Sequence, residues 1–188
     1  MKHVNYQLKP EMGFLIGREE GVRLKEEICK FLGEQETNTA LVLDFSQVEF
    51  IDVSCADELV VKVLARLQAG EIPDRFLILS ALKPQHRENI EAALTVGGKA
   101  VFVQTEDSWT TLGELISSYR DALEVVNGKN VITARELYDE MHYETINESS
   151  TKLSALYKLC LIGREPYRRP VRGGGRQFRY LSVLSDAE

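Results

Sequence analysis

Four side chains in the first half of the chain have types and spacing that could do chemistry: Asp44, Asp52, Ser54 and Cys55. Ser54 precedes a helical pattern, so we expect its hydroxyl to cap that helix by accepting a backbone N–H. Asp44 and Asp52 could together bind a cation, but we favour an arrangement in which one carboxylate caps and the other is solvated. Cys55 falls in the first helical turn, where a thiol pKa can be lowered. Simple packing is the more common role of such a cysteine.

A second candidate site is defined by charge. Residues 149–180 contain eight Lys or Arg residues and one acidic residue, Glu165, in a chain whose net charge is −6. This asymmetry is typical of a surface that faces phosphate groups. The alternative is a solvated basic loop.

The rest of the composition argues against several classes of protein. The 188 residues include three cysteines without a CxxC spacing and three histidines, so we expect no metal site and no disulfide framework. Dinucleotide-binding, P-loop, hydrolase and zinc-protease motifs are absent from the sequence, so we expect no catalytic residue, no cofactor and no enzyme activity. The first residues do not resemble a signal peptide, and no stretch reaches the length of a membrane span. We therefore expect a cytoplasmic protein without membrane contact.

The first half alternates helical and strand patterns. Helical spacing predicts helices over residues 18–33, 54–67 and 85–96. Short apolar runs or alternation predict strands over residues 14–16, 40–45, 48–51, 75–79 and 100–103. Strands separated by helices of this length imply a largely parallel sheet.

The second half predicts helices followed by a closing strand pair. A first helix is expected from Ser108 to about Val126, and Thr133 with Glu136 forms a capping box that begins a second helix. Turn and cap residues at 147–150 precede a third helix over 149–160. Strands are expected near residues 131–132, 161–164 and 176–184, with Phe178, Tyr180 and Ser182 on one face of the last.

The run from Leu41 to Ser54, LVLDFSQVEFIDVS, resembles the core of STAS domains, the fold of anti-sigma-factor antagonists. The wider resemblance extends from about Gly13 to Gln104 and implies an α/β STAS-like mixed sheet with helices over residues 1–107. In partner-switching STAS proteins the second serine of an Asp-Ser-Ser-Gly motif is phosphorylated, and that position corresponds to Ser54, two residues after Asp52. This sequence departs from the motif at Val53 and Cys55. A phosphate at Ser54 would lie favourably at a helix N-terminus, and a purely capping role is the alternative that we favour.

Two runs in the second half, ITAREL at 132–137 and SSTKLSALYKLCLIGR at 149–164, resemble a winged helix-turn-helix. The resemblance implies an α+β winged-helix domain over residues 108–188, with Cys160 where such regulators usually carry glycine. In this fold the third helix enters the major groove of DNA. The resemblance therefore implies base contacts from Ser149, Ser150, Thr151 and Lys152. The wing arginines that would reach phosphate or the minor groove are Arg168, Arg169, Arg172 and Arg176.

Together the two resemblances imply a DNA-binding transcriptional regulator whose STAS-like domain receives a protein or phosphorylation signal. The expected partners are double-stranded DNA and a protein such as an anti-sigma-type kinase, and a homodimer stays open. The alternative is a partner-switching adaptor that does not bind DNA and uses both domains for protein–protein interaction. The acidic second helix, with Glu136, Asp139, Glu140 and Glu144, is the feature that favours this alternative.

Overall fold

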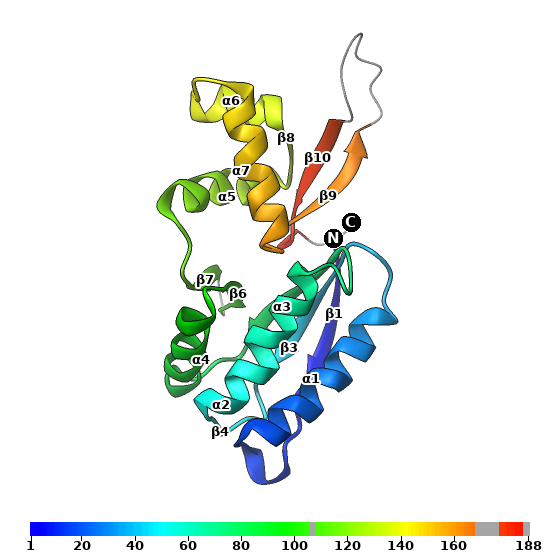
Figure 1. The fold of residues 1–188 in the computed structure, drawn as a ribbon, viewed down its shortest axis with the longest axis vertical. Coiled ribbons are helices and arrows are strands. Elements are labelled where there is room, and N and C mark those ends of the chain that lie inside the picture. Colours follow the sequence, from blue (N-terminus) through cyan, green and yellow to red (C-terminus); the bar gives the residue numbers. More distant parts are fainter. Residues whose placement is uncertain (106–107, 168–176, 186–188) are drawn as a thin grey trace. The chain divides into compact units, whose positions relative to one another are not determined.

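The chain forms a mixed α/β protein with two compact units, Lys2–Leu115 and Ile116–Glu188, in a computed structural model (Figure 1). The structure describes residues 1–105, 108–167 and 177–185. A mixed parallel and antiparallel sheet with several helices was expected from the sequence, and this part of the expectation is confirmed. In the described part of the chain, no helix combines the length and apolar character needed to cross a membrane.

The first unit is built on a five-stranded sheet in the order β1-β3-β5-β6-β7. Its strands are β1 (Lys2–Gln7), β3 (Thr39–Asp44), β5 (Arg75–Ser80), β6 (Ala100–Gln104) and β7 (Trp109–Gly113). The first four are parallel, whereas β7 runs antiparallel to β6. Two short strands, β2 (Phe14–Leu15) and β4 (Phe50–Ile51), pair separately.

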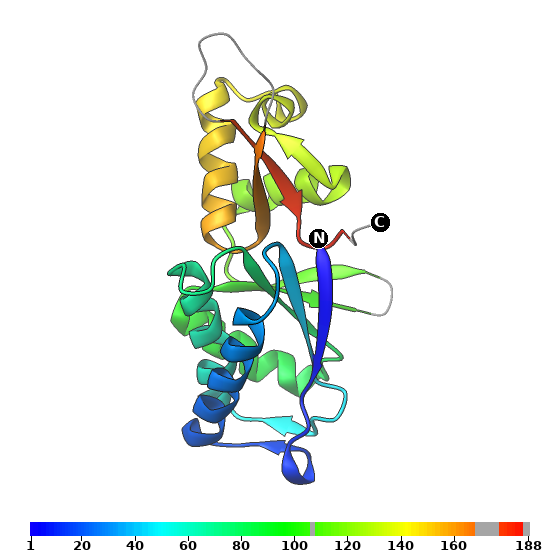
Figure 2. The same cartoon turned by 90° about the vertical axis from the view of Figure 1, so that its right-hand side faces the viewer.

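Helices connect the parallel strands of this unit, and α1 and α3 lie against the same face of the sheet (Figures 1 and 2). The helical segments are η1 (Glu11–Gly13), α1 (Arg18–Gly33), α2 (Val53–Ala56), η2 (Asp57–Val61), α3 (Lys62–Gln68) and α4 (Pro84–Gly97). The helix predicted from Ser54 is therefore one continuous helical segment over α2, η2 and α3, in which η2 is a turn of π-helix. The helices expected over residues 18–33 and 85–96 are confirmed.

The sheet is strongly curved. His3 on β1 and Trp109 on β7 belong to opposite edges, yet their ring centroids are 6.3 Å apart. In a flat sheet, four interstrand spacings would separate those edges by about 19 Å. The curvature encloses the face that these two rings share, which explains why its other apolar side chains, among them Val42, Ile78 and Phe102, are buried although α1 and α3 cover the opposite face.

The helix expected from Ser108 was predicted wrongly at its start. Residues Trp109–Gly113 form β7 and pair with the edge of β6, and the helix α5 begins only at Ser117. Pairing with the edge of β6 satisfies the backbone N–H and C=O groups of this segment. The spacing of its apolar residues could not reveal that a strand partner was present. Gly113 has φ 90°, and a Cβ there would lie 2.2 Å from the carbonyl oxygen of Lys99.

The units divide between Leu115 and Ile116, whereas the sequence placed the boundary between residues 107 and 108.

The first helix approaches the second very closely at Gly21. A Cβ added to Gly21 would lie 2.8 Å from the Cβ of Glu58 and 2.9 Å from the carbonyl oxygen of Cys55. The same contact holds the buried Glu58 carboxylate, which pairs with Lys25 at 2.7 Å and with Arg18 at 2.6 Å. The hydrogen bond from Lys25 lowers the pKa of Glu58, although burial opposes the shift.

We expect Gly21→Ala to lower the free energy of unfolding by about 1–3 kcal/mol, because the added methyl group meets backbone atoms that cannot rotate away. Gly33→Ala is the matched control. Gly33 ends the same helix with open space around its Cα, so the same substitution there should be neutral or stabilise by up to about 1 kcal/mol. Urea unfolding of both variants measures the difference, and equal effects would contradict the close contact.

The second unit contains three helices and a three-stranded antiparallel sheet in the order β8-β10-β9. Its elements are α5 (Ser117–Lys129), β8 (Val131–Thr133), α6 (Ala134–Met141), α7 (Ile146–Lys158), β9 (Ile162–Tyr167) and β10 (Gln177–Ser182). Leu137, Leu153 and Leu156 are buried between the helices and the sheet. The predicted capping box is confirmed: Thr133 and Glu136 cap each other's backbone N–H at the start of α6.

The third helix of this unit begins earlier than expected. Its N-cap is Thr145, whose hydroxyl accepts the N–H of Glu148 at 3.2 Å, so the cap expected at residues 147–150 was wrong. The Thr145-x-x-Glu148 spacing is itself typical of a helix start and was overlooked. After α7 the chain turns at Cys160, which has φ 58°, a conformation more readily adopted by glycine.

Candidate functional site

Asp52 lies where β4 ends and α2 begins, and its carboxylate accepts two backbone N–H groups. One oxygen accepts from Cys55 at 2.7 Å and the other from Gly17 at 2.8 Å. Gly17 is the N-cap residue of α1, and Asp52 is the N-cap residue of α2. One carboxylate therefore satisfies the first turns of two helices, where backbone donors lack intrahelical partners.

The cap predicted at Ser54 was therefore wrong, because Asp52 occupies the capping position. Ser54 lies inside the first turn of α2 and is exposed. A capping side chain must precede the N–H groups that it accepts, and Ser54 begins too late to do so. Its hydroxyl is accessible to solvent, beside the exposed side chain of Val53.

Cys55 is packed in the core, which is the role that the sequence favoured over a reactive thiol. Its side chain is buried, and burial, with a smaller contribution from the Asp52 carboxylate, raises its pKa to about 12. A thiol with this pKa stays protonated near neutral pH. The lowered pKa considered for Cys55 was therefore wrong, and its side chain belongs to the core beneath the corner.

The two carboxylates considered as a cation site have separate hydrogen-bond partners. Asp52 accepts the two N–H groups described above, whereas Asp44 accepts the backbone N–H of Ser46 at 2.7 Å and its hydroxyl at 3.0 Å. Within residues 1–105, 108–167 and 177–185, no group of three or more His, Cys, Asp or Glu side chains is arranged to hold a metal ion. The corner is thus organised by backbone donors.

We expect Asp52→Ala to lower the free energy of unfolding by about 1–3 kcal/mol, because it leaves two part-buried N–H groups without their acceptor. Ser54→Ala should change it by no more than about 0.5 kcal/mol, because the substitution removes an exposed side chain that caps nothing. Urea unfolding of both variants separates the two roles. A larger destabilisation by Ser54→Ala than by Asp52→Ala would restore Ser54 as the cap.

The face of α7 proposed to meet DNA is only partly exposed. Ser149 is fully buried, and its hydroxyl donates to the carbonyl oxygens of Ala134 and Ile146, both at 2.9 Å. It joins α7 to α6 and leaves no side-chain surface for a base contact, which corrects the exposed position expected for it. Ser150 is half-buried and Thr151 is exposed.

Lys152 interacts mainly with its own unit. Its ammonium nitrogen lies 3.0 Å from a carboxylate oxygen of Glu148 and 4.2 Å from the ring centroid of Tyr143, and 15% of its side chain is exposed. Burial lowers the pKa of Lys152, but the interaction with the Glu148 carboxylate raises it by more, so the net shift is upward. Lys152 is therefore positively charged, and its ammonium group is largely occupied by contacts with neighbouring side chains.

Other described cations of this unit also have partners. Lys129 pairs with Glu140 at 2.8 Å, and Arg179 pairs with Glu165. Arg164 lies over the rings of Tyr157 and Phe178, at 4.1 Å and 4.3 Å from their centroids. The predicted wing residues Arg168, Arg169, Arg172 and Arg176 lie outside the described residues.

Sequence reasoning missed Asn147 on α7. Thr145 begins the helix, so Asn147 and Thr151 lie one turn apart and both are exposed. The earlier helix start would have revealed this pair.

Comparison with models of known protein families, with curated proteins and with solved structures gave no match.

Proposed function

We propose that the chain is a transcriptional regulator, in which residues 116–185 belong to a winged-helix module that binds double-stranded DNA and the first unit is a STAS-like signal-receiving domain. The observation that carries the proposal is the element order of the second unit. One helix, a short strand, two helices and an antiparallel strand pair follow one another, and β10 lies between β8 and β9. That order is the one expected for a winged helix-turn-helix.

The polar surface of α7 supports a role in the major groove. Asn147 and Thr151 present an amide and a hydroxyl from one exposed face, and such groups can hydrogen-bond to base edges. Ser150 lies beside them and is half-buried. In the proposed complex, these three residues read bases, while Ser149 only fixes the helix in place.

The charge needed for phosphate binding comes mainly from the predicted wing. Residues 166–179 contain Arg168, Arg169, Arg172, Arg176 and Arg179 with no acidic residue. Sequence-independent affinity for DNA depends on such cations, because each phosphate contact releases counterions. The wing therefore supplies affinity and α7 supplies selectivity.

The alternative function, a protein-binding adaptor, is favoured by one observation. Lys129, Lys152 and Arg179 each pair with a carboxylate of their own unit. Cations neutralised in this way contribute less to phosphate binding. In the adaptor model both units bind proteins, for example an anti-sigma-type kinase or a second copy of this chain.

The first experiment replaces Arg168, Arg169, Arg172 and Arg176 together with alanine in the full chain. We expect weaker binding to every DNA sequence and a slope of log affinity against log salt that is less steep by up to about 0.9 for each phosphate that the variant no longer neutralises. Gel shifts over a salt series on duplexes selected from the host genome give the slope. The matched control replaces Lys2, Lys9, Lys30 and Lys62 of the first unit, which are all exposed.

Equal slopes for the wing variant and the unaltered chain would remove the wing from the interface. Absence of DNA binding by the unaltered chain at low salt would favour the adaptor. A reduction in affinity that is as large in the lysine control would show that total charge, and not the wing, determines the affinity.

The second experiment tests Ser54 as the input. If Ser54 is a switch, Ser54→Asp should change the affinity for DNA several-fold relative to Ser54→Ala, because it adds charge at an exposed corner. Thr95→Asp is the matched control, since Thr95 is an exposed hydroxyl residue on α4 of the same unit. Intact-mass measurement of protein isolated from its host shows whether a phosphoryl group is present. Equal affinities for all three variants, with no phosphoryl group, would exclude the switch.

A further inference from the structure

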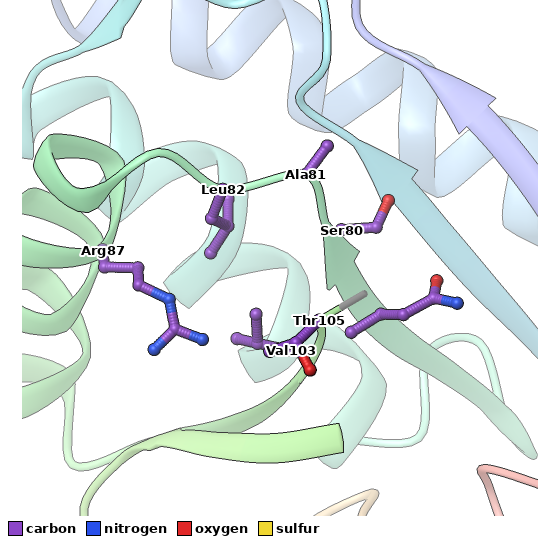
Figure 3. A pocket seen from close by; sticks show the side chains of 7 residues that line it. Ser80, Ala81, Leu82, Arg87, Val103 and Thr105 are labelled. Atoms are coloured by element: carbon purple, nitrogen blue, oxygen red, sulfur yellow. The ribbon is translucent and has the colours of Figure 1, made fainter. Parts of the chain in front are cut away.

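A cavity of about 430 Å³ lies at the carboxyl ends of the parallel strands β5 and β6. Ser80 and Ala81 border it from the end of β5, Val103 and Thr105 from the end of β6, and Arg87 from the first turns of α4 (Figure 3). The carboxyl edge of a parallel sheet is the usual place for ligands in open α/β folds. The volume is within the range of small-molecule sites.

Arg87 is the feature that marks this cavity as a binding site. Its side chain extends from α4 toward Val103 and Thr105 (Figure 3) and is half-buried. In the part of the chain that the structure describes, its guanidinium forms no ion pair. Nearby Lys83, by contrast, pairs with Glu49 at 2.6 Å. An arginine on the wall of an open pocket, with no counterion from the described residues, leaves its N–H groups available to an anion from outside the chain.

The other walls of the cavity determine which groups would contact the rest of a bound anionic molecule. Leu82 and Val103 provide apolar surface, and Ser80 provides a hydroxyl whose contact with the carbonyl oxygen of Leu43 is long, at 3.5 Å. Ala81 has φ 56°, a conformation that is unfavourable for a residue with a side chain and that shapes the rim of the cavity. The site thus combines one cation, the weakly committed hydroxyl of Ser80, the polar side chains of Gln104 and Thr105, and an apolar wall.

We propose that this cavity binds a small organic carboxylate with an apolar tail, held by a forked contact to Arg87. A guanidinium matches a carboxylate geometrically, because two parallel N–H groups meet two oxygens. One guanidinium balances the single negative charge of a carboxylate, whereas a phosphate dianion would bring a second negative charge with no second cation among the described residues that line the pocket. The tail packs on Leu82 and Val103. This inference goes beyond the proposed regulator and does not depend on DNA binding.

The test titrates the full chain with sodium hexanoate while the amide and arginine Nε–H signals are followed by NMR. Sodium chloride at matched ionic strength and inorganic phosphate are the parallel titrations. Saturable shifts with hexanoate at Arg87, Ser80 and Val103, absent with chloride, are the expected result. Stronger binding of phosphate than of hexanoate would overturn the carboxylate assignment, and shifts that do not saturate would overturn the site.

Three variants separate the site from general charge effects. Arg87→Gln should weaken hexanoate binding by about tenfold or more, since the substitution removes the charged hydrogen bonds. Arg87→Lys should weaken it by an intermediate factor because it keeps the charge without the fork. Arg135→Gln is the control, an exposed arginine of the second unit whose contact with Asp139 is loose, at 3.6 Å. Unchanged binding in folded Arg87→Gln and Arg87→Lys, each verified by its amide spectrum, would contradict the proposal.

Discussion

The Asp52 carboxylate is the interaction on which the corner of the first unit depends. It accepts the N–H of Gly17 and of Cys55, so it joins the start of α1 to the start of α2. The two helices can meet so closely only because Gly21 has no side chain, and the contact then encloses Glu58 with Arg18 and Lys25. Replacing the carboxylate would leave donors from both helices without partners at the same place.

The sequence suggested two roles for Ser54, capping the helix and receiving a phosphate. In the structure, the capping role belongs to another residue. The structural role belongs to Asp52 and to the buried Cys55, whereas Ser54 takes no part in the cap and faces solvent. The exposed hydroxyl of Ser54 does not cap the helix, so a phosphate added there would not displace a capping bond. The proposed input at Ser54 is therefore compatible with a corner that stays folded in both states.

In the second unit, several of the described cations contact neighbouring side chains. Lys152 meets Glu148 and Tyr143, and Arg164 lies over two aromatic rings, so these side chains stabilise the unit itself. The proposed DNA contacts consequently divide between a polar helix face at Asn147 and Thr151 and the arginines of the wing. Selectivity and affinity would then come from different segments, which is a common division in DNA-binding modules.

Local patterns in the sequence were sufficient for α1, α4, the buried strands β3, β5 and β6, and the capping box of α6, because each depends on neighbours along the chain. Three features required the tertiary structure. Trp109–Gly113 became a strand because β6 offered an unpaired edge, the Asp52 carboxylate joined two helices because Gly17 presented a second donor, and Ser149 was buried because α6 lies against α7. In each case the deciding group lies outside the segment itself, in the paired strand, at the start of α1 or in the neighbouring helix, so the pattern within the segment could not reveal it.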